Sequence, residues 1–179
     1  MYMNMSKITP LCKWMRIILL LLIFAIPIAI AINWLSGAHN GLSTIPSNLL
    51  PLVDVNHTLS PQEKTWGLIV SLIPAAFAIA IMYAFAIVFK QFSHGEIFTG
   101  PSISGFRWAA ALIIIWEIVQ PAYDILMGMV LTPNHMASIK FIQYDISNLR
   151  GLIIGIVLCV IARVIAEARN LKSEVDLTI

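Results

Sequence analysis

The sequence predicts an all-α membrane protein in which four transmembrane helices form an up-down-up-down bundle and both termini are cytoplasmic. The composition is the first observation: of the 179 residues, 59% are hydrophobic and 11% are charged, whereas about a quarter of the residues in a soluble domain are charged. The second observation is four apolar stretches, each long enough to cross a hydrocarbon core of about 30 Å as a helix. The third is the distribution of lysine and arginine. We therefore expect a single integral membrane domain over residues 1–179.

The first apolar stretch covers about residues 14–34 and contains an unbroken apolar block over residues 17–32. Basic residues precede it and Ser36-Gly37-Ala38 follows it, so it also resembles a secretory signal peptide with its cleavage site. The block is longer than the roughly 7–15 residues of a typical signal core. We expect this stretch to be kept as a transmembrane helix, with cleavage as the alternative.

Three further stretches follow, at about residues 66–89, 106–131 and 149–168. The second stretch is preceded by Ser60-Pro61-Gln62-Glu63, which fits a capping box with proline in the first turn. The fourth is the weakest, because Arg163 interrupts it. Short connections join antiparallel neighbours in helical bundles, which predicts the up-down-up-down order. The remaining segments are an outer loop at 35–65, a cytoplasmic loop at 90–107 and a cytoplasmic tail at 169–179.

Tryptophan residues mark the ends of these stretches. Trp14, Trp34, Trp66 and Trp108 all lie near a predicted boundary. An indole is favourable there because its ring can stay in the interfacial region while its N–H remains hydrated. We therefore expect all four indoles at the membrane–water interface.

The orientation follows from the bias of lysine and arginine toward the cytoplasmic side. If the amino terminus is inside, the cytoplasmic segments hold eight basic residues: Lys7, Lys13, Arg16, Lys90, Arg107, Arg163, Arg169 and Lys172. The outer segments then hold three: Lys64, Lys140 and Arg150. This difference predicts that both termini are cytoplasmic. Because topology accounts for the basic residues, the net charge of +2 gives no indication of nucleic-acid binding, and we expect none.

A polar stripe lies within the third stretch. Glu117, Gln120 and Asp124 are spaced by offsets of three and seven residues, which places them on one face of a helix. A carboxylate at mid-membrane costs at least about 2.5–3.5 kcal/mol, so such a group usually faces the interior of a bundle or water. Our leading interpretation is an ion pair between Glu117 and Arg163 on the fourth helix, about one turn nearer the cytoplasm. The alternatives are a stripe that handles protons or cations, a ligand pocket, or an Asp124 that simply reaches the outer interface.

The sequence contains none of the common catalytic motifs. GxSxG, HExxH, the Walker motif and CxxC are all absent from it. His39, His57 and His135 fall on the predicted outer side, near Asp54, but without the local spacing of a metal site. We therefore expect no enzyme activity, no catalytic residue, no metal and no cofactor.

Two short motifs carry a family resemblance. The carboxy-terminal segment ends in Leu171, Glu174, Asp176, Leu177, Thr178 and Ile179, and the loop after the second stretch contains Gly95-Glu96-Ile97-Phe98-Thr99. Both resemble elements of the DUF2975 family of bacterial membrane proteins, which are similar over four segments in the same order. The resemblance implies a four-helix protein of the bacterial inner membrane with unassigned biochemistry. It also implies a partner, since relatives often lie beside genes for small helix-turn-helix regulators.

These observations lead to two functional hypotheses. The first is a regulatory or interaction protein that docks a soluble cytoplasmic partner through the cytoplasmic loop and the tail. The residues expected to dock are Glu96, Ile97, Phe98, Glu174, Asp176, Leu177, Thr178 and Ile179. The alternative is a small transporter or proton- or cation-handling module that uses the polar stripe. Four helices are few for a transport path, so this alternative requires a homo-oligomer.

Overall fold

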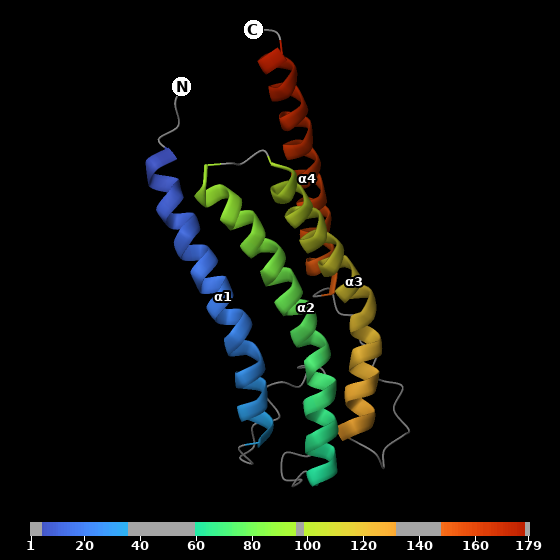
Figure 1. Cartoon of the computed structure of the whole chain (residues 1–179). Helices are drawn as coiled ribbons and strands as arrows, with labels where there is room; N and C mark the ends of the chain where they lie inside the picture. The colour runs from blue at the N-terminus through green and yellow to red at the C-terminus, as the bar shows by residue number, and fades with distance from the viewer. Residues whose placement is uncertain (1–4, 36–59, 96–98, 132–147, 178–179) are drawn as a thin grey trace.

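The computed structural model describes residues 5–35, 60–95, 99–131 and 148–177 of the chain. They form four long helices: α1 (Met5–Leu35), α2 (Pro61–Ser93), α3 (Gly100–Leu131) and α4 (Asn148–Leu177). Figure 1 shows them side by side with their axes roughly aligned. Each helix is long and apolar enough to cross a membrane. The predicted fold class is confirmed: the chain is a multi-pass, all-α membrane protein.

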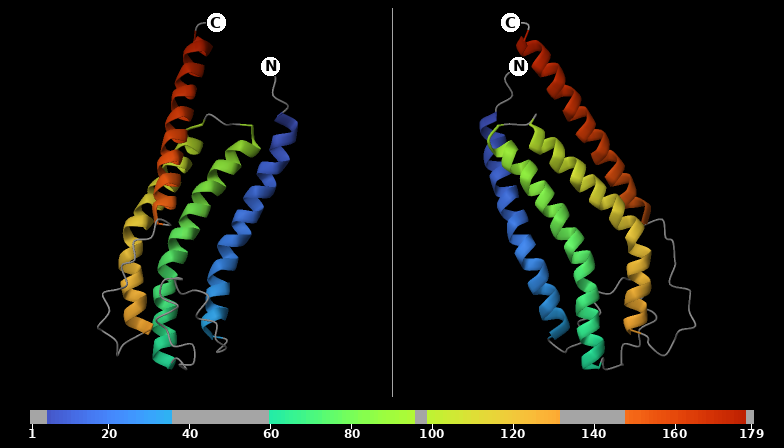
Figure 2. Two further views of the ribbon diagram at one scale, coloured as in Figure 1. Left: turned by 180° about the vertical axis from the view of Figure 1, so that it is seen from behind. Right: turned by 45° about the vertical axis from the view of Figure 1, so that its right-hand side comes forward.

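The helices form a row in which each packs on the next. Consecutive helices run in opposite directions, and both chain ends lie at the same end of the molecule as the connection between α2 and α3 (Figures 1 and 2). We call this end the termini end. Within the described ranges, the substantial helix–helix contacts are those of α1 with α2, α2 with α3 and α3 with α4. The predicted up-down-up-down order is therefore correct, and α4 is held chiefly by α3.

The ends of α2 follow from local hydrogen bonding. The Ser60 side chain accepts from the Glu63 N–H at 3.3 Å, and the Glu63 carboxylate accepts from the Ser60 N–H at 2.7 Å. This reciprocal pair is the capping box that the sequence predicts. At the other end the chain leaves the helix through Gly95, whose φ of 78° lies in the left-handed region that favours glycine.

The helices extend beyond the stretches predicted to cross the membrane. The expected cytoplasmic loop at 90–107 is much shorter, because α2 continues to Ser93 and α3 already begins at Gly100. The Ile103 N–H donates to the Thr99 carbonyl at 3.1 Å, which closes the first turn of α3. The expected tail from residue 169 continues α4 as far as Leu177. The predicted bounds follow the apolar residues alone, whereas a helix continues beyond them as long as its backbone hydrogen bonds are satisfied.

One of the four tryptophans predicted to have a hydrated indole N–H is buried instead. Trp14, Trp66 and Trp108 are largely exposed, but Trp34 is only 2% exposed. Its indole N–H donates to the Ser71 hydroxyl at 3.0 Å. The Trp34 ring packs over Gly67, where a side-chain carbon would clash with three of its ring atoms. A buried partner on α2 therefore replaces the water that we expected for this indole.

The core of the row lies around this tryptophan. Trp34 from α1, Val70 from α2, and Tyr123 and Met127 from α3 form one cluster of buried side chains. The Tyr123 side chain hydrogen-bonds to Ser71, which also donates to the Gly67 carbonyl at 2.7 Å. Three helices are thus joined at a single serine, in the half of the molecule remote from the termini end.

Candidate functional site

The polar stripe of α3 is only partly exposed. Glu117 and Gln120 are half-buried and Asp124 is buried at 6% exposure. Pro121 lies between them, and α3 continues through it without a break. Three polar side chains are therefore removed from most of the surrounding solvent, at a depth where the helix would lie inside the membrane.

Glu117 packs against the first turn of α4. Its carboxyl group occupies the space that a side chain at Gly151 would need, so only glycine fits at this position. The Glu117 Oε2 atom is buried and has no hydrogen-bond partner among the described residues. The first turn of a helix carries unpaired N–H groups and a partial positive charge, which favours a nearby carboxylate. The amino-terminal end of α4 therefore provides the favourable surroundings for Glu117.

The predicted ion pair between Glu117 and Arg163 is wrong. Gly151 is the α4 residue that meets Glu117, and Arg163 follows it by twelve residues, or about 18 Å along the helix. Arg163 is exposed on α4. The error came from the assumption that α3 and α4 overlap along their whole length. In Figures 1 and 2, α4 instead begins about halfway along α3, which shifts every α4 residue toward the termini end.

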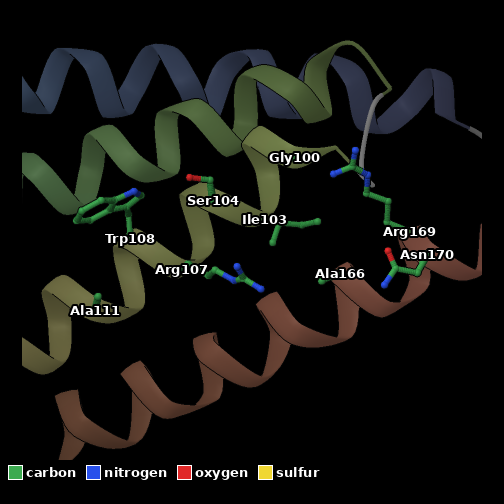
Figure 3. Close-up of a pocket in the computed structure, with 9 residues that line it drawn as sticks. All are labelled: Gly100, Ile103, Ser104, Arg107, Trp108, Ala111, Ala166, Arg169 and Asn170. Carbon is green, nitrogen blue, oxygen red and sulfur yellow. The ribbon is translucent and has the colours of Figure 1, made fainter. Parts of the chain in front are cut away.

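A polar cavity of about 630 Å³ lies between α3 and α4 at the termini end. Figure 3 shows Arg107 on the side of α3 that faces α4, and Arg169 and Asn170 on α4. Arg169 reaches the start of α3: a side-chain carbon added to Gly100 would lie 3.3 Å from its Nη1 atom. Two arginines from different helices thus line one cavity beside a helix amino terminus.

A second cavity, of about 750 Å³, lies on the other side of α3, against α2. Its lining is mostly apolar and includes Tyr83, Ile87 and Leu112. The two cavities share lining residues on α3, among them Ser104 and Trp108. A polar cavity and an apolar groove therefore meet along about two turns of α3, from Gly100 to Trp108.

Sequence reasoning missed both cavities and the packing of α4. It used Arg107 and Arg169 only as markers of orientation, because nothing local in the sequence shows that they come together. Gly151 and Gly155 were missed too, although their GxxxG spacing is a recognised signal for close packing of membrane helices. Gly155 faces Ile114 and the Ala110 carbonyl on α3.

Most of the predicted docking residues fall outside what the structure describes. Glu96, Ile97, Phe98, Thr178 and Ile179 lie outside the described ranges. Asp176 and Leu177 belong to the last turn of α4, but their side chains are not described, whereas Glu174 is exposed on α4. The docking surface stays a prediction.

Comparisons with known proteins identify a family. Among the described residues, no group of three or more His, Cys, Asp or Glu side chains could hold a metal ion. No curated protein and no solved structure matches the chain. The sequence pattern of one family, described as a protein of unknown function (DUF2975), matches residues 4–179. Since this match covers nearly the whole chain, the protein belongs to the DUF2975 family.

Proposed function

We propose that the protein is a regulatory or interaction protein of the bacterial inner membrane that docks a soluble cytoplasmic partner at its termini end. The docking surface comprises the end of α4 and the connection between α2 and α3. One observation carries this proposal: α4 continues past the start of α3 as a single helix (Figures 1 and 2).

The extension of α4 can be measured along the helix. Arg169 lies beside Gly100, the first residue of α3, and α4 ends at Leu177. The helix therefore extends about 12 Å further, at 1.5 Å per residue. A projecting helix that is continuous with a membrane span gives a partner a fixed surface, because the partner need not order a flexible tail. Glu174 and Asp176 supply charge on this extension.

The proposed orientation is supported by two features together. The termini end holds both chain ends and the connection between α2 and α3 (Figure 1). The halves of the four helices nearest this end hold eight of the eleven lysines and arginines. The positive-inside rule then places this end in the cytoplasm, where a soluble regulator can reach it.

The test is recruitment of a soluble partner to membranes. A small helix-turn-helix regulator is co-expressed with the full chain, or with a chain that ends after Asn170, and the membranes are collected after cross-linking. The shortened chain keeps Arg169 and Asn170, so the cavity between α3 and α4 retains its lining. We expect the regulator in the membrane fraction with the full chain and in the soluble fraction with the shortened one. Equal recovery with both chains rules out the end of α4 as the docking surface.

A second candidate function rests on Glu117. A buried carboxylate oxygen without a hydrogen-bond partner is typical of groups that take up a proton or a cation. In this candidate, several copies of the row assemble around the polar stripe of α3. Vesicles that contain the protein should then show proton or cation flux that Glu117→Gln abolishes. Glu167→Gln, at an exposed position of α4, is the matched control. If vesicles with the unaltered protein show no proton or cation flux, this candidate function is excluded.

A further inference from the structure

The polar cavity between α3 and α4 has the chemistry of an anion site. Arg107 and Arg169 line it from two helices, and no acidic side chain is among its described lining residues. A guanidinium group presents its N–H donors as a planar fork that matches the oxygens of a phosphate. Two such groups at one cavity repel each other unless an anion lies between them.

The start of α3 adds to this positive field. Gly100 lines the cavity, and the Arg169 guanidinium lies against it. The first turn of a helix has N–H groups without intrahelical partners and a partial positive charge, and these groups bind phosphate in many proteins. The Arg169 guanidinium of α4 and the amino terminus of α3 therefore both favour an anion at this end of the cavity.

The apolar groove lies beside the polar cavity along the same stretch of α3. Gly100 and Trp108 line both spaces, Ala111 lines the polar cavity and Leu112 lines the groove. On α4, the lining of the polar cavity includes Arg169, two residues from Leu171, where the candidate span ends. On α2, the groove is lined by Ile87 and residues deeper in the span, and Ile87 lies six residues, or about 9 Å, inside the end of that span at Ser93. The α2 wall of the groove therefore lies deeper in the spans than Arg169 does.

We propose that this pair of spaces binds one anionic phospholipid. Its phosphate lies between Arg107 and Arg169, and one acyl chain lies in the groove along Tyr83, Ile87 and Leu112. Charge complementarity selects an anionic headgroup over a zwitterionic one. The groove selects a lipid over a soluble phosphate, because a small anion leaves about 750 Å³ of mostly apolar space unused. This site does not depend on the docking of a protein partner.

The test compares lipids of equal chain length and different headgroup. The full chain is purified in a neutral detergent, and the retention of phosphatidylglycerol and of phosphatidylcholine is measured by native mass spectrometry and by the shift in melting temperature. We expect phosphatidylglycerol to be retained and to raise the melting temperature more than phosphatidylcholine does. Arg107→Gln and Arg169→Gln should each weaken phosphatidylglycerol binding by about tenfold, the effect of losing one charged hydrogen bond, and the two combined should weaken it by about a hundredfold.

Two more variants separate this site from general surface charge. Ser104 is exposed and lines both spaces, so Ser104→Phe should fill their junction and weaken lipid binding while both arginines remain. Arg163→Gln removes an exposed arginine of α4 that lines neither space, and it should bind lipid as the unaltered chain does. An equal loss in Arg163→Gln would overturn the proposal.

Inorganic phosphate and glycerol phosphate distinguish a lipid from a free anion. At millimolar concentration, neither should reproduce the shift in melting temperature that phosphatidylglycerol gives. If either one does, or if phosphatidylcholine binds as well as phosphatidylglycerol, the lipid assignment is wrong.

Discussion

Ser71 is a single small residue on which three helices depend. Its hydroxyl accepts from the Trp34 indole and donates to the Gly67 carbonyl, and Tyr123 hydrogen-bonds to it as well. Inside a membrane, polar side chains at helix interfaces favour association because water cannot replace the lost partner. The hydroxyl of Ser71 therefore positions α1 and α3 relative to α2.

Replacing Trp34 with phenylalanine tests this arrangement. Trp34→Phe removes the indole donor and part of the ring, and we expect the free energy of unfolding in detergent to fall by about 1–2 kcal/mol. Trp66→Phe is the matched control, because Trp66 is 59% exposed. This substitution should change the free energy of unfolding by less than about 0.5 kcal/mol. Equal effects from both variants would contradict a special role for the buried indole.

Glu117 and Gly151 form the second pair of residues with a shared role. Since the Glu117 carboxyl fills the space beside Gly151, Gly151→Leu should displace it and cost about 1–3 kcal/mol. Adding Glu117→Ala should restore part of that loss, so the two substitutions should be strongly non-additive in thermal unfolding.

The pair of Glu117 and Arg163 gives the complementary experiment. Because about 18 Å of helix separates Arg163 from the residue that meets Glu117, Glu117→Gln and Arg163→Gln should be additive within about 0.5 kcal/mol. A large coupling energy between these two residues would show that α4 is shifted relative to the position described above.

At the scale of the helices, α4 is held to α3 by small side chains. Gly155 faces Ile114 and the Ala110 carbonyl, and Ala110 and Ala162 are both fully or almost fully buried. Small residues let two membrane helices approach closely enough for van der Waals contacts to hold them together. The outward side chains of α4, such as Ile156 and Val160, are exposed and face lipid in a membrane.

Enlarging Gly155 should separate α3 from α4. A side-chain carbon there would lie 2.6 Å from Ile114 Cγ1 and 3.3 Å from the Ala110 carbonyl oxygen, so Gly155→Leu should cost about 1–3 kcal/mol. Ile156→Leu, on the exposed side of the same helix, should leave the melting temperature unchanged. A Gly155→Leu variant with unchanged stability would mean that this contact does not hold α4.

The four helices could be predicted from the sequence because the hydropathy of each stretch depends only on the residues within it. The capping box at Ser60 and the helix end at Gly95 were predictable for the same reason. The register of α4 on α3 was not, since it depends on where α4 begins relative to Glu117. The placement of Arg107 and Arg169 on one cavity follows from that register, so the polar cavity could not be predicted before the fold was known.

At the scale of the whole molecule, the row has two ends that differ in chemistry. One end has the buried cluster around Trp34, and the other has the arginine-lined cavity and both termini. The orientation in the membrane therefore decides which compartment the cavity faces.

Labelling with an impermeant maleimide in intact cells tests this orientation. In a chain without its own cysteines, Gln62→Cys at the start of α2 should react from outside. His94→Cys at the end of α2 should react only after the membrane is opened. Both positions are exposed, so a difference in labelling reports the side of the membrane and not burial. The reverse pattern would place the termini outside and contradict the proposed cytoplasmic docking.

The late start of α4 also gives the described part of the molecule a taper. Four helices lie abreast near the termini end, but only α1, α2 and α3 continue to the opposite end (Figures 1 and 2). In cross-section, the described helices therefore occupy more area in one leaflet than in the other. A tapered protein is accommodated best where the leaflet around its wider part is stretched by curvature. The protein should therefore prefer membrane regions whose curvature matches its taper.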